Sequence, residues 1–379
     1  MKIVANIAPL HEGAIIRERN IFEHLSKIDK KNQYVILGRE ETKKAFQGLG
    51  DNFEFQEVYP NTKNYFTRLL WENISLPFLL KRLKADILYF PHQLTNLLGF
   101  TRKVITVQNA LPFEERIIRE LGLLKGLKFR LLAFATKLSI SRADCTIFMS
   151  QYLKAKVLKN SAKGYFPVIR HGAAANPAGS NSSWSDKGRF LESIGVGKDY
   201  MLLVSHIYPY KNIINVVEGY RAAKDKCPDL EPLIVAGEKY DRGYYAEIQS
   251  CIEKYELNDS VKFVGDIEHE NLAFFYMNCK FFIFPSKCEN APVTLMEALS
   301  YGLPITCSQI EPNVEICADS ALYFNPDKCG EISECLLAMH GDESLRKDLS
   351  ARSLERAKSF SWEESAREIL NVFEKVYSM

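Results

Sequence analysis

Short apolar runs rich in β-branched residues alternate along the chain with longer segments of helical periodicity. In the first half a helix is predicted around residues 17–27, and five runs predict buried strands: KIVANIA (2–8), QYVILG (33–38), ADILYFP (85–91), KVITVQ (103–108) and DCTIFMS (144–150). Apolar strands that are separated by helices are typical of a parallel sheet built from βαβ units. The first half therefore predicts one doubly wound α/β domain.

The alternation restarts after residues 171–188, HGAAANPAGSNSSWSDKG, which are small, polar and without periodicity. Helices are expected to begin near Asn212, Tyr244, Asn271 and Pro292, and six runs predict strands: YMLLVS (200–205), PLIVAG (232–237), VKFVG (261–265), KFFIFP (280–285), LPITCS (303–308) and ALYF (321–324). We expect two Rossmann-like domains facing across a cleft, at residues 1–175 and 189–355, with a linker at 176–188. A C-terminal helix at 356–379 is expected to return toward the first domain.

The composition is that of an ordinary globular protein, with 46% hydrophobic and 25% charged residues in a chain of 379. No apolar run approaches the roughly 20 residues that cross a bilayer, and the N-terminal segment lacks the pattern of a signal peptide. The nine cysteines form no CxxC pair, and we expect them to be reduced. These features predict a cytoplasmic protein.

The net charge of +2 conceals a segregation of charge along the chain. Residues 1–175 contain 28 Lys and Arg against 15 Asp and Glu, whereas the remainder contains 21 against 32. The excess is densest at 116–170, and no nucleic-acid-binding motif accompanies it, so it favours an anionic membrane surface or a phosphate-bearing substrate over nucleic acid. Within 122–140 the basic positions do not share one helix face, so a partly buried helix is the alternative to a membrane-surface helix.

The segment FFIFPSKCENAPVTLMEALSYGLPITCS (281–308) concentrates the candidate chemistry. A strand runs into a turn that contains Glu289, and a helix with Pro292 in its first turn carries Glu297. At about 1.5 Å per residue, Pro292 and Glu297 are separated by about 8 Å of helix. The free N–H groups near Val293 and Thr294 form the positive end of that helix and attract a phosphate. One turn therefore offers three contacts to a ligand.

This segment resembles the signature of the retaining glycosyltransferases of family 4, which are two-domain GT-B enzymes. The family frame, PS-x-x-E followed by EA-x-x-x-G-x-P, is represented here by Pro285, Ser286, Glu289, Glu297, Ala298, Gly302 and Pro304. Upstream, LLVSHIYPYKNIINVVEGY (202–220) resembles the family's GR…KN segment, with Lys211 and Asn212 in place. The resemblance is strong from 201 to 325 and fainter through the first half.

The resemblance implies a retaining hexosyltransferase with an acceptor-binding first domain and a donor-binding second domain. Such an enzyme moves a sugar from a UDP- or GDP-sugar to a hydroxyl of a saccharide or lipid-linked acceptor, in surface polysaccharide or glycolipid synthesis, in the cytoplasm or on the inner face of the membrane. No cofactor is expected. No metal is expected either, because the chain contains no Asp-x-Asp and fixed positive groups can stabilise the leaving diphosphate instead.

The resemblance also assigns roles to individual residues. Glu289 would bind the donor sugar with the backbone of the residues after it, Glu297 would hold the ribose hydroxyls, and Lys211 would neutralise the diphosphate. The loop after the strand at 261–265 would frame the base, and Gly13, in the first loop of the acceptor domain, would let the backbone approach the diphosphate. The donor-binding set is Gly13, Gly265, Asp266, Ile267, Asn290, Ala291, Pro292, Val293, Thr294 and Glu297, and the catalytic set is Lys211, Glu289, His206 and Gln108.

Two positions depart from the family pattern. The family's arginine is replaced by His206, which is not a permanent charge, and its frequent His-Asp pair by Gln108 and Asn109, which cannot shuttle a proton. Two alternatives therefore stay open: a sugar-nucleotide 2-epimerase, and a catalytically inactive sugar-nucleotide-binding protein. No nucleophilic carboxylate is identifiable, so family analogy favours front-face attack by the acceptor. His11 and His92 are weaker candidates for the cleft.

Overall fold

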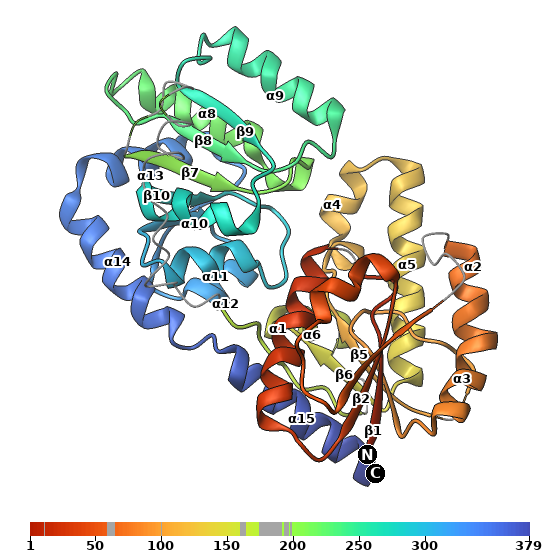
Figure 1. Ribbon diagram of the computed structural model, residues 1–379. Coiled ribbons are helices and arrows are strands. Elements are labelled where there is room, and N and C mark those ends of the chain that lie inside the picture. Colours follow the sequence, from red (N-terminus) through yellow and green to blue (C-terminus); the bar gives the residue numbers. More distant parts are fainter. Residues whose placement is uncertain are drawn as a thin grey trace. The chain divides into compact units, whose positions relative to one another are not determined.

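The computed structural model describes residues 1–10, 12–58, 65–99, 101–159, 164–173, 192, 197 and 199–379. The chain forms two compact units, Met1–Gly172 with Ser361–Met379, and Ala173–Phe360 (Figure 1). Each unit contains a six-stranded sheet whose described strands all pair in parallel. The predicted class, α/β with two doubly wound domains, is confirmed.

The sheet of the first unit has the order β3-β2-β1-β4-β5-β6. Its strands are β1 (Lys2–Asn6), β2 (Gln33–Gly38), β3 (Phe53–Glu57), β4 (Ile87–Phe90), β5 (Arg102–Val107) and β6 (Cys145–Phe148). Its helices are α1 (Glu12–Ile28), α2 (Tyr65–Leu70), α3 (Leu76–Leu83), α4 (Glu115–Glu120), α5 (Leu123–Arg142), α6 (Gln151–Leu158) and α15 (Trp362–Ser378). Short turns are η1 (Glu40–Phe46), the π-helical η2 (Trp71–Ser75) and η3 (Leu111–Phe113). Five strands match predicted runs, and β3 is the addition.

The sheet of the second unit has the order β12-β11-β10-β7-β8-β9. Its strands are β7 (Tyr200–Val204), β8 (Leu233–Ala236), β9 (Val261–Gly265), β10 (Cys279–Phe284), β11 (Ile305–Ser308) and β12 (Ala321–Phe324). Its helices are η4 (Pro209–Lys211), α8 (Ile213–Lys224), α9 (Arg242–Lys254), α10 (His269–Asn278), α11 (Val293–Ser300), α12 (Glu311–Cys317), α13 (Cys329–Gly341) and α14 (Glu343–Ala357). All six strands match the predicted runs.

The chain leaves the first unit after Gly172 and returns to it after Phe360. The predicted linker at 176–188 lies outside the described residues. The segment predicted as one returning helix, 356–379, divides instead: α14 ends at Ala357 in the second unit, and α15 packs beside α1 in the first (Figure 1). A Cβ on Gly172 would lie 2.3 Å from Trp362, so this crossing requires glycine.

In each sheet the strand order reverses at one point, between β1 and β4 in the first and between β7 and β10 in the second. Open parallel sheets bind ligands beyond the carboxyl ends of their strands at this point, because the two flanking connections run to opposite faces there. In the second unit the loops that begin there are 205–212 and 285–292. They contain Lys211 and Glu289, two predicted catalytic residues.

Candidate active site

The loops after β7 and β10 are fixed to each other by hydrogen bonds. Asn212 has φ of 60° and its side-chain amide donates to the carbonyls of Pro285, at 3.2 Å, and Pro326, at 2.7 Å. The backbone N–H of Lys287 donates to the carbonyl of Tyr210 at 2.8 Å. The two residues of the predicted KN pair therefore differ in their roles. Asn212 fixes the loop after β7 to the loop after β10, and Lys211 lies on the loop that Asn212 fixes.

Lys211 and Glu289 form an ion pair at the point where the strand order reverses. The distance from Lys211 Nζ to Glu289 Oε1 is 2.6 Å, and the side chains are only 17% and 11% exposed. The ammonium also lies 5.7 Å from the centre of the Phe284 ring and 5.5 Å from that of Tyr210. Partial burial limits screening by solvent, so this cation can stabilise a phosphate strongly.

Glu297 lies inside α11, on the buried side of the helix. Its Oε2 accepts a hydrogen bond from the Tyr276 hydroxyl at 3.0 Å, and the Tyr276 ring stacks on Tyr301 at 5.0 Å. Burial, followed by the charge of Glu297, holds the pKa of Tyr276 well above its usual range. Tyr276 therefore stays a donor and keeps the Glu297 carboxylate in one orientation.

Helix α11 starts close to the predicted position. Pro292 is the N-cap residue in extended conformation rather than a residue of the first turn, because the helix begins at Val293, followed by Thr294. Asn290 and Ala291 are buried, so their side chains face the protein. The first-turn N–H groups are the groups of this segment that can meet an anion.

The residues predicted to frame the base follow β9. Gly265 ends the strand with φ of 77°, and its carbonyl accepts from Gly237 N at 2.7 Å. A Cβ on Gly265 would meet no atom within 4 Å, so the left-handed backbone, rather than crowding, favours glycine there. Asp266 is exposed and Ile267 half-buried.

His206 lies in the loop after β7, at the edge of an aromatic stack that was not predicted. Its Nδ1 accepts from Glu238 N at 3.4 Å, and its ring meets Tyr240 edge-on at 4.8 Å. The Tyr208 ring stacks between Tyr240 and Tyr210, at 5.5 Å from each. The YPY tripeptide before Lys211 was the available signal for this stack.

The predicted residues of the first unit lie at the carboxyl side of its sheet. Gln108 follows β5, is half-buried, and donates from its amide to the carbonyl of Pro91. Gly13 lies in the first turn of α1, so the prediction of a loop there was wrong: the helix begins at Glu12. A Cβ on Gly13 would meet no protein atom within 4 Å, and the approach of the backbone to a diphosphate there stays a prediction. His11 lies outside the described residues.

A buried polar group at the carboxyl end of β1 was not predicted. Glu72, in η2, is 2% exposed and accepts from the Asn6 amide at 3.2 Å. Burial raises the pKa of Glu72 to about 7, against the opposing effect of Arg68, whose Nε is 3.9 Å away. Burial, followed by the charge of Arg68, also lowers the pKa of His92 to about 3, which keeps that ring neutral. A lone glutamate in an apolar helix gave no signal of this arrangement.

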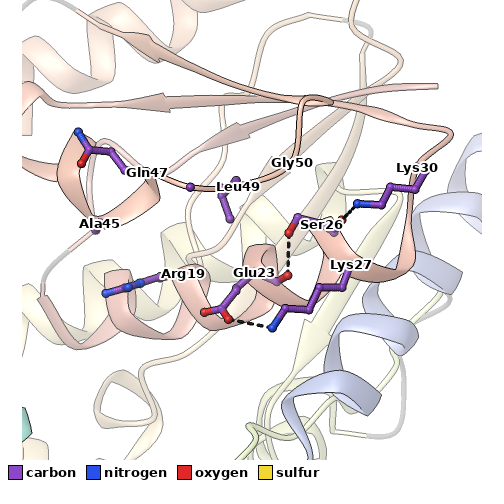
Figure 2. A pocket seen from close by; sticks show the side chains of 10 residues that line it. Arg19, Glu23, Ser26, Lys27, Lys30, Ala45, Gln47, Leu49 and Gly50 are labelled. Atoms are coloured by element: carbon purple, nitrogen blue, oxygen red, sulfur yellow. Dashed lines mark hydrogen bonds and ion pairs between the residues drawn. The ribbon is translucent and has the colours of Figure 1, made fainter.

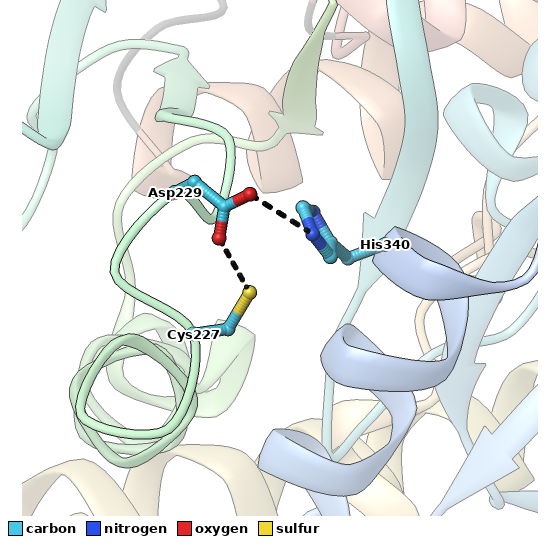
Figure 3. A group of neighbouring side chains, drawn as sticks. All are labelled: Cys227, Asp229 and His340. Carbon is cyan, nitrogen blue, oxygen red and sulfur yellow. Dashed lines mark hydrogen bonds and ion pairs between the residues drawn. The ribbon is translucent and has the colours of Figure 1, made fainter.

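Two further groups of side chains stand apart from the predicted site. Figure 2 shows a hollow between α1 and the residues after η1, where Lys27 pairs with Glu23 at 2.9 Å; none of the predicted site residues line it. Figure 3 shows Cys227, Asp229 and His340 close enough to hold a metal ion. Cys227 Sγ already donates to Asp229 at 3.0 Å, and Asp229 is 83% exposed. Metal-independent transfer at Lys211 stays a prediction.

The second unit contains a segment that is similar to a known protein family. Residues 186–356 match the family model described as glycosyl transferases group 1. The O-antigen chain mannosyltransferase B of Escherichia coli is 28% identical over 175 residues, which cover 46% of this chain and 45% of that protein. The chain thus spans less than half the length of the curated relatives it matches first.

Solved structures resemble the whole described fold. The Anabaena protein Alr3699/HepE in complex with UDP and glucose gives a TM-score of 0.73 at 15% identity, covering 99% of this chain and 100% of that one. The sucrose-phosphate synthase of Thermosynechococcus elongatus gives 0.75 at 16% identity, covering 100% and 99%. These similarities confirm the predicted GT-B fold class.

Proposed function

We propose that this chain, whose residues 186–356 match the family model of glycosyl transferases group 1, is a glycosyltransferase that uses a nucleotide-diphosphate sugar. The sugar passes to a hydroxyl of a saccharide or lipid-linked acceptor with retention of anomeric configuration, and the product enters a surface polysaccharide or glycolipid. The enzyme acts in the cytoplasm, at the inner face of the membrane where its acceptor is lipid-linked.

The Lys211–Glu289 pair is the observation that carries this proposal. It places a half-buried cation and a carboxylate 2.6 Å apart at the point where the strand order reverses, in the loops that flank the N-terminus of α11. A nucleotide-diphosphate sugar presents a dianionic diphosphate next to a polyhydroxylated ring. Lys211 suits the first of these groups and Glu289 the second, so the pair matches the donor at its reacting bond.

The reaction requires the bond between the anomeric carbon and the diphosphate oxygen to break, with the electron pair leaving on the diphosphate. Lys211 and the first-turn N–H groups of α11 stabilise that charge as it develops. The acceptor oxygen forms the new bond on the face that the diphosphate leaves, and its proton passes to the departing phosphate oxygen. Positioning and electrostatics supply most of the rate enhancement, since this route needs no strong base.

Glu297 and the end of β9 fit the nucleoside part of the donor. A carboxylate fixed by Tyr276 at 3.0 Å can accept hydrogen bonds from two neighbouring ribose hydroxyls. The turn at Gly265, Asp266 and Ile267 offers backbone groups to the base, and its left-handed glycine gives the turn its shape. UDP- and GDP-sugars are the donors to test, because the relatives include mannosyltransferases and a protein solved with UDP and glucose.

A donor panel tests the proposal. The chain is incubated with UDP- and GDP-hexoses, with and without a lipid extract, and free nucleotide and the sugar's configuration are measured. We expect nucleotide release that depends on both donor and acceptor. It should be slowed by about 10- to 150-fold in Lys211→Met and unchanged in Lys287→Met, whose lysine lies in the neighbouring loop paired with Asp327 at 3.0 Å. Inversion at the sugar's C2 would identify an epimerase, and binding without turnover an inactive binding protein. Either result would overturn the proposal.

A further inference from the structure

The first unit exposes a group of large apolar side chains, which we name the apolar ridge. Its members lie on α2, η2, α3, the loop after β4 and α5: Leu70, Ile74, Phe78, Leu97, Leu98, Leu123, Leu124, Leu127, Leu131 and Phe134. They are ten of the seventeen large apolar side chains that are exposed in the described part of the chain. Leu123 and Leu124 are 86% and 84% exposed, and Phe134 is 70% exposed. Such a concentration marks an interaction surface, whereas scattered exposed leucines would not.

Helical spacing aligns these side chains. Leu70, Ile74 and Phe78 recur every four residues along α2, η2 and α3, and Leu127, Leu131 and Phe134 recur every three or four along α5. The loop after β4 connects the two helical segments, because Leu97 N donates to Asn73 Oδ1 at 2.8 Å and Thr95 N donates to Ser139 Oγ at 3.2 Å. The elements that carry the ridge, α2, η2, α3, the loop after β4 and α5, are therefore linked to one another within the first unit.

Helix α5 exposes more of its large apolar side chains than it buries. The residues that it buries against the unit are Gly126, Thr136, Ser139 and Ile140, three of them small or polar, while four of its six leucines and Phe134 are exposed. A helix on the surface of a globular protein ordinarily turns its large apolar side chains toward the core. The sequence left a partly buried helix open for 122–140, and α5 is partly buried and also exposes an apolar face.

The charge on the same elements is almost entirely positive. Residues 65–84 and 121–142 contain nine Lys and Arg and a single acidic residue, Glu72, which is buried. Lys125, Lys128 and Lys137 on α5 are exposed. Long basic side chains beside an apolar face can extend to a charged interface while their stems stay in apolar surroundings. The basic residues therefore need not share one face of α5.

We propose that the apolar ridge inserts into an anionic lipid surface, with the lysines and arginines around it on the headgroups. Apolar side chains flanked by basic residues fit acyl chains and anionic headgroups at once. A second copy of this chain fits less well, because a symmetric interface would bring two positive surfaces together. The apolar ridge would then be the surface from which the enzyme reaches a lipid-linked acceptor. Only this link to the acceptor rests on the proposed function.

Vesicle cosedimentation with the full chain tests the proposal. The vesicles contain phosphatidylcholine alone or with phosphatidylglycerol, and binding is measured at low and at high salt. We expect binding to the anionic vesicles that weakens with salt. The ridge variant combines three substitutions, Leu124→Ser, Leu127→Ser and Phe134→Ser. We expect its binding to anionic vesicles to be about tenfold weaker or more, because three inserted side chains are lost. Combined Lys125→Ser, Lys128→Ser, Arg130→Ser should weaken binding at low salt most, since each charge near the surface contributes about fivefold there.

A matched control carries serine in place of three exposed apolar residues of the second unit, Met277, Val314 and Leu354, and should bind vesicles like the wild type. Absent binding to anionic vesicles at low salt, or equal binding by the ridge variant, overturns the proposal. A wild-type dimer that the ridge variant loses, seen by analytical ultracentrifugation without vesicle binding, would instead assign the surface to a second copy and also overturn it. Calorimetry with UDP and GDP tests the proposed function separately from membrane binding. We expect the ridge variant to bind nucleotide like the wild type, whether or not the wild type binds vesicles.

Discussion

Replacement of Lys211 by methionine tests the proposed donor chemistry most directly. The substitution removes the charge and keeps most of the side-chain volume beside Phe284 and Tyr210. In the structure Lys211 makes a 2.6 Å contact with Glu289, and both side chains are largely shielded from solvent. A diphosphate that replaced the carboxylate as its partner would receive a comparable charge-assisted contact, which stabilises by about 1.5–3 kcal/mol.

That range corresponds to a loss of about 10- to 150-fold, and it should appear in the chemical rate because the contact strengthens as charge develops on the leaving group. Single-turnover kinetics measures the rate, and calorimetry compares nucleoside diphosphate with nucleoside monophosphate. We expect Lys211→Met to weaken diphosphate binding and leave monophosphate binding unchanged. Lys287→Met, which removes a neighbouring lysine paired with Asp327, should change neither.

A stability measurement excludes a folding artefact in that experiment. The Glu289 carboxylate is only 11% exposed, and Lys211→Met removes the cation that pairs with it. The melting temperature of the single variant should therefore fall. The double variant Lys211→Met, Glu289→Gln should recover part of that loss, while the defect in rate stays. Unchanged rate together with unchanged diphosphate affinity in Lys211→Met would remove this lysine from the mechanism.

Three further expectations follow from the site and from the first unit. Glu297→Gln should weaken binding of the nucleotide product by about 1–3 kcal/mol, because the amide offers one acceptor oxygen; wild-type affinity by calorimetry would exclude the ribose assignment. Transfer should survive EDTA, since Lys211 and the start of α11 are fixed positive groups; a complete loss that Mg²⁺ or Mn²⁺ restores would contradict this. The pKa of Glu72 is raised from 4.5 to about 7, so the folded state must hold a buried charge as pH rises, and stability falls between about pH 4.5 and pH 7 by about 3 kcal/mol. Glu72→Gln should remove that fall in thermal melts, and exposed Glu54→Gln should not.

The strands that sequence predicts well are those whose residues are mostly apolar. All six strands of the second unit and five of the first coincide with such runs, including the edge strands β6, β9 and β12, whereas β3, FEFQE, contains three polar residues and none of its residues is fully buried. An edge strand can be partly exposed, so a polar composition like that of β3 does not distinguish it from a loop. Gly13 illustrates the converse: a glycine near a predicted helix start was read as a loop, yet the first turn of α1 tolerates it.

The site was predictable as a set of residues but not as a set of contacts. The spacing of Glu289 and Glu297 along one segment gave their positions on a turn and a helix. The pairing of Lys211 with Glu289, 78 residues apart, depends on which two strands flank the reversal of the sheet, and periodicity does not fix strand order. Glu72 and the tyrosine stack were missed because their character comes from burial and from neighbours distant in sequence.

The return of the chain to the first unit has a consequence for synthesis. Helix α15 places Ala366, Ile369, Val372, Phe373 and Val376 in the core of the first unit, where Phe373 meets Tyr89 at 5.3 Å. These side chains leave the ribosome only after every residue of the second unit has been made. The second unit can therefore complete its fold first, although it is encoded later, while the first waits with part of its core uncovered. Domains that fold in order of synthesis avoid this interval of exposure, so a chaperone should encounter the nascent first unit rather than the second.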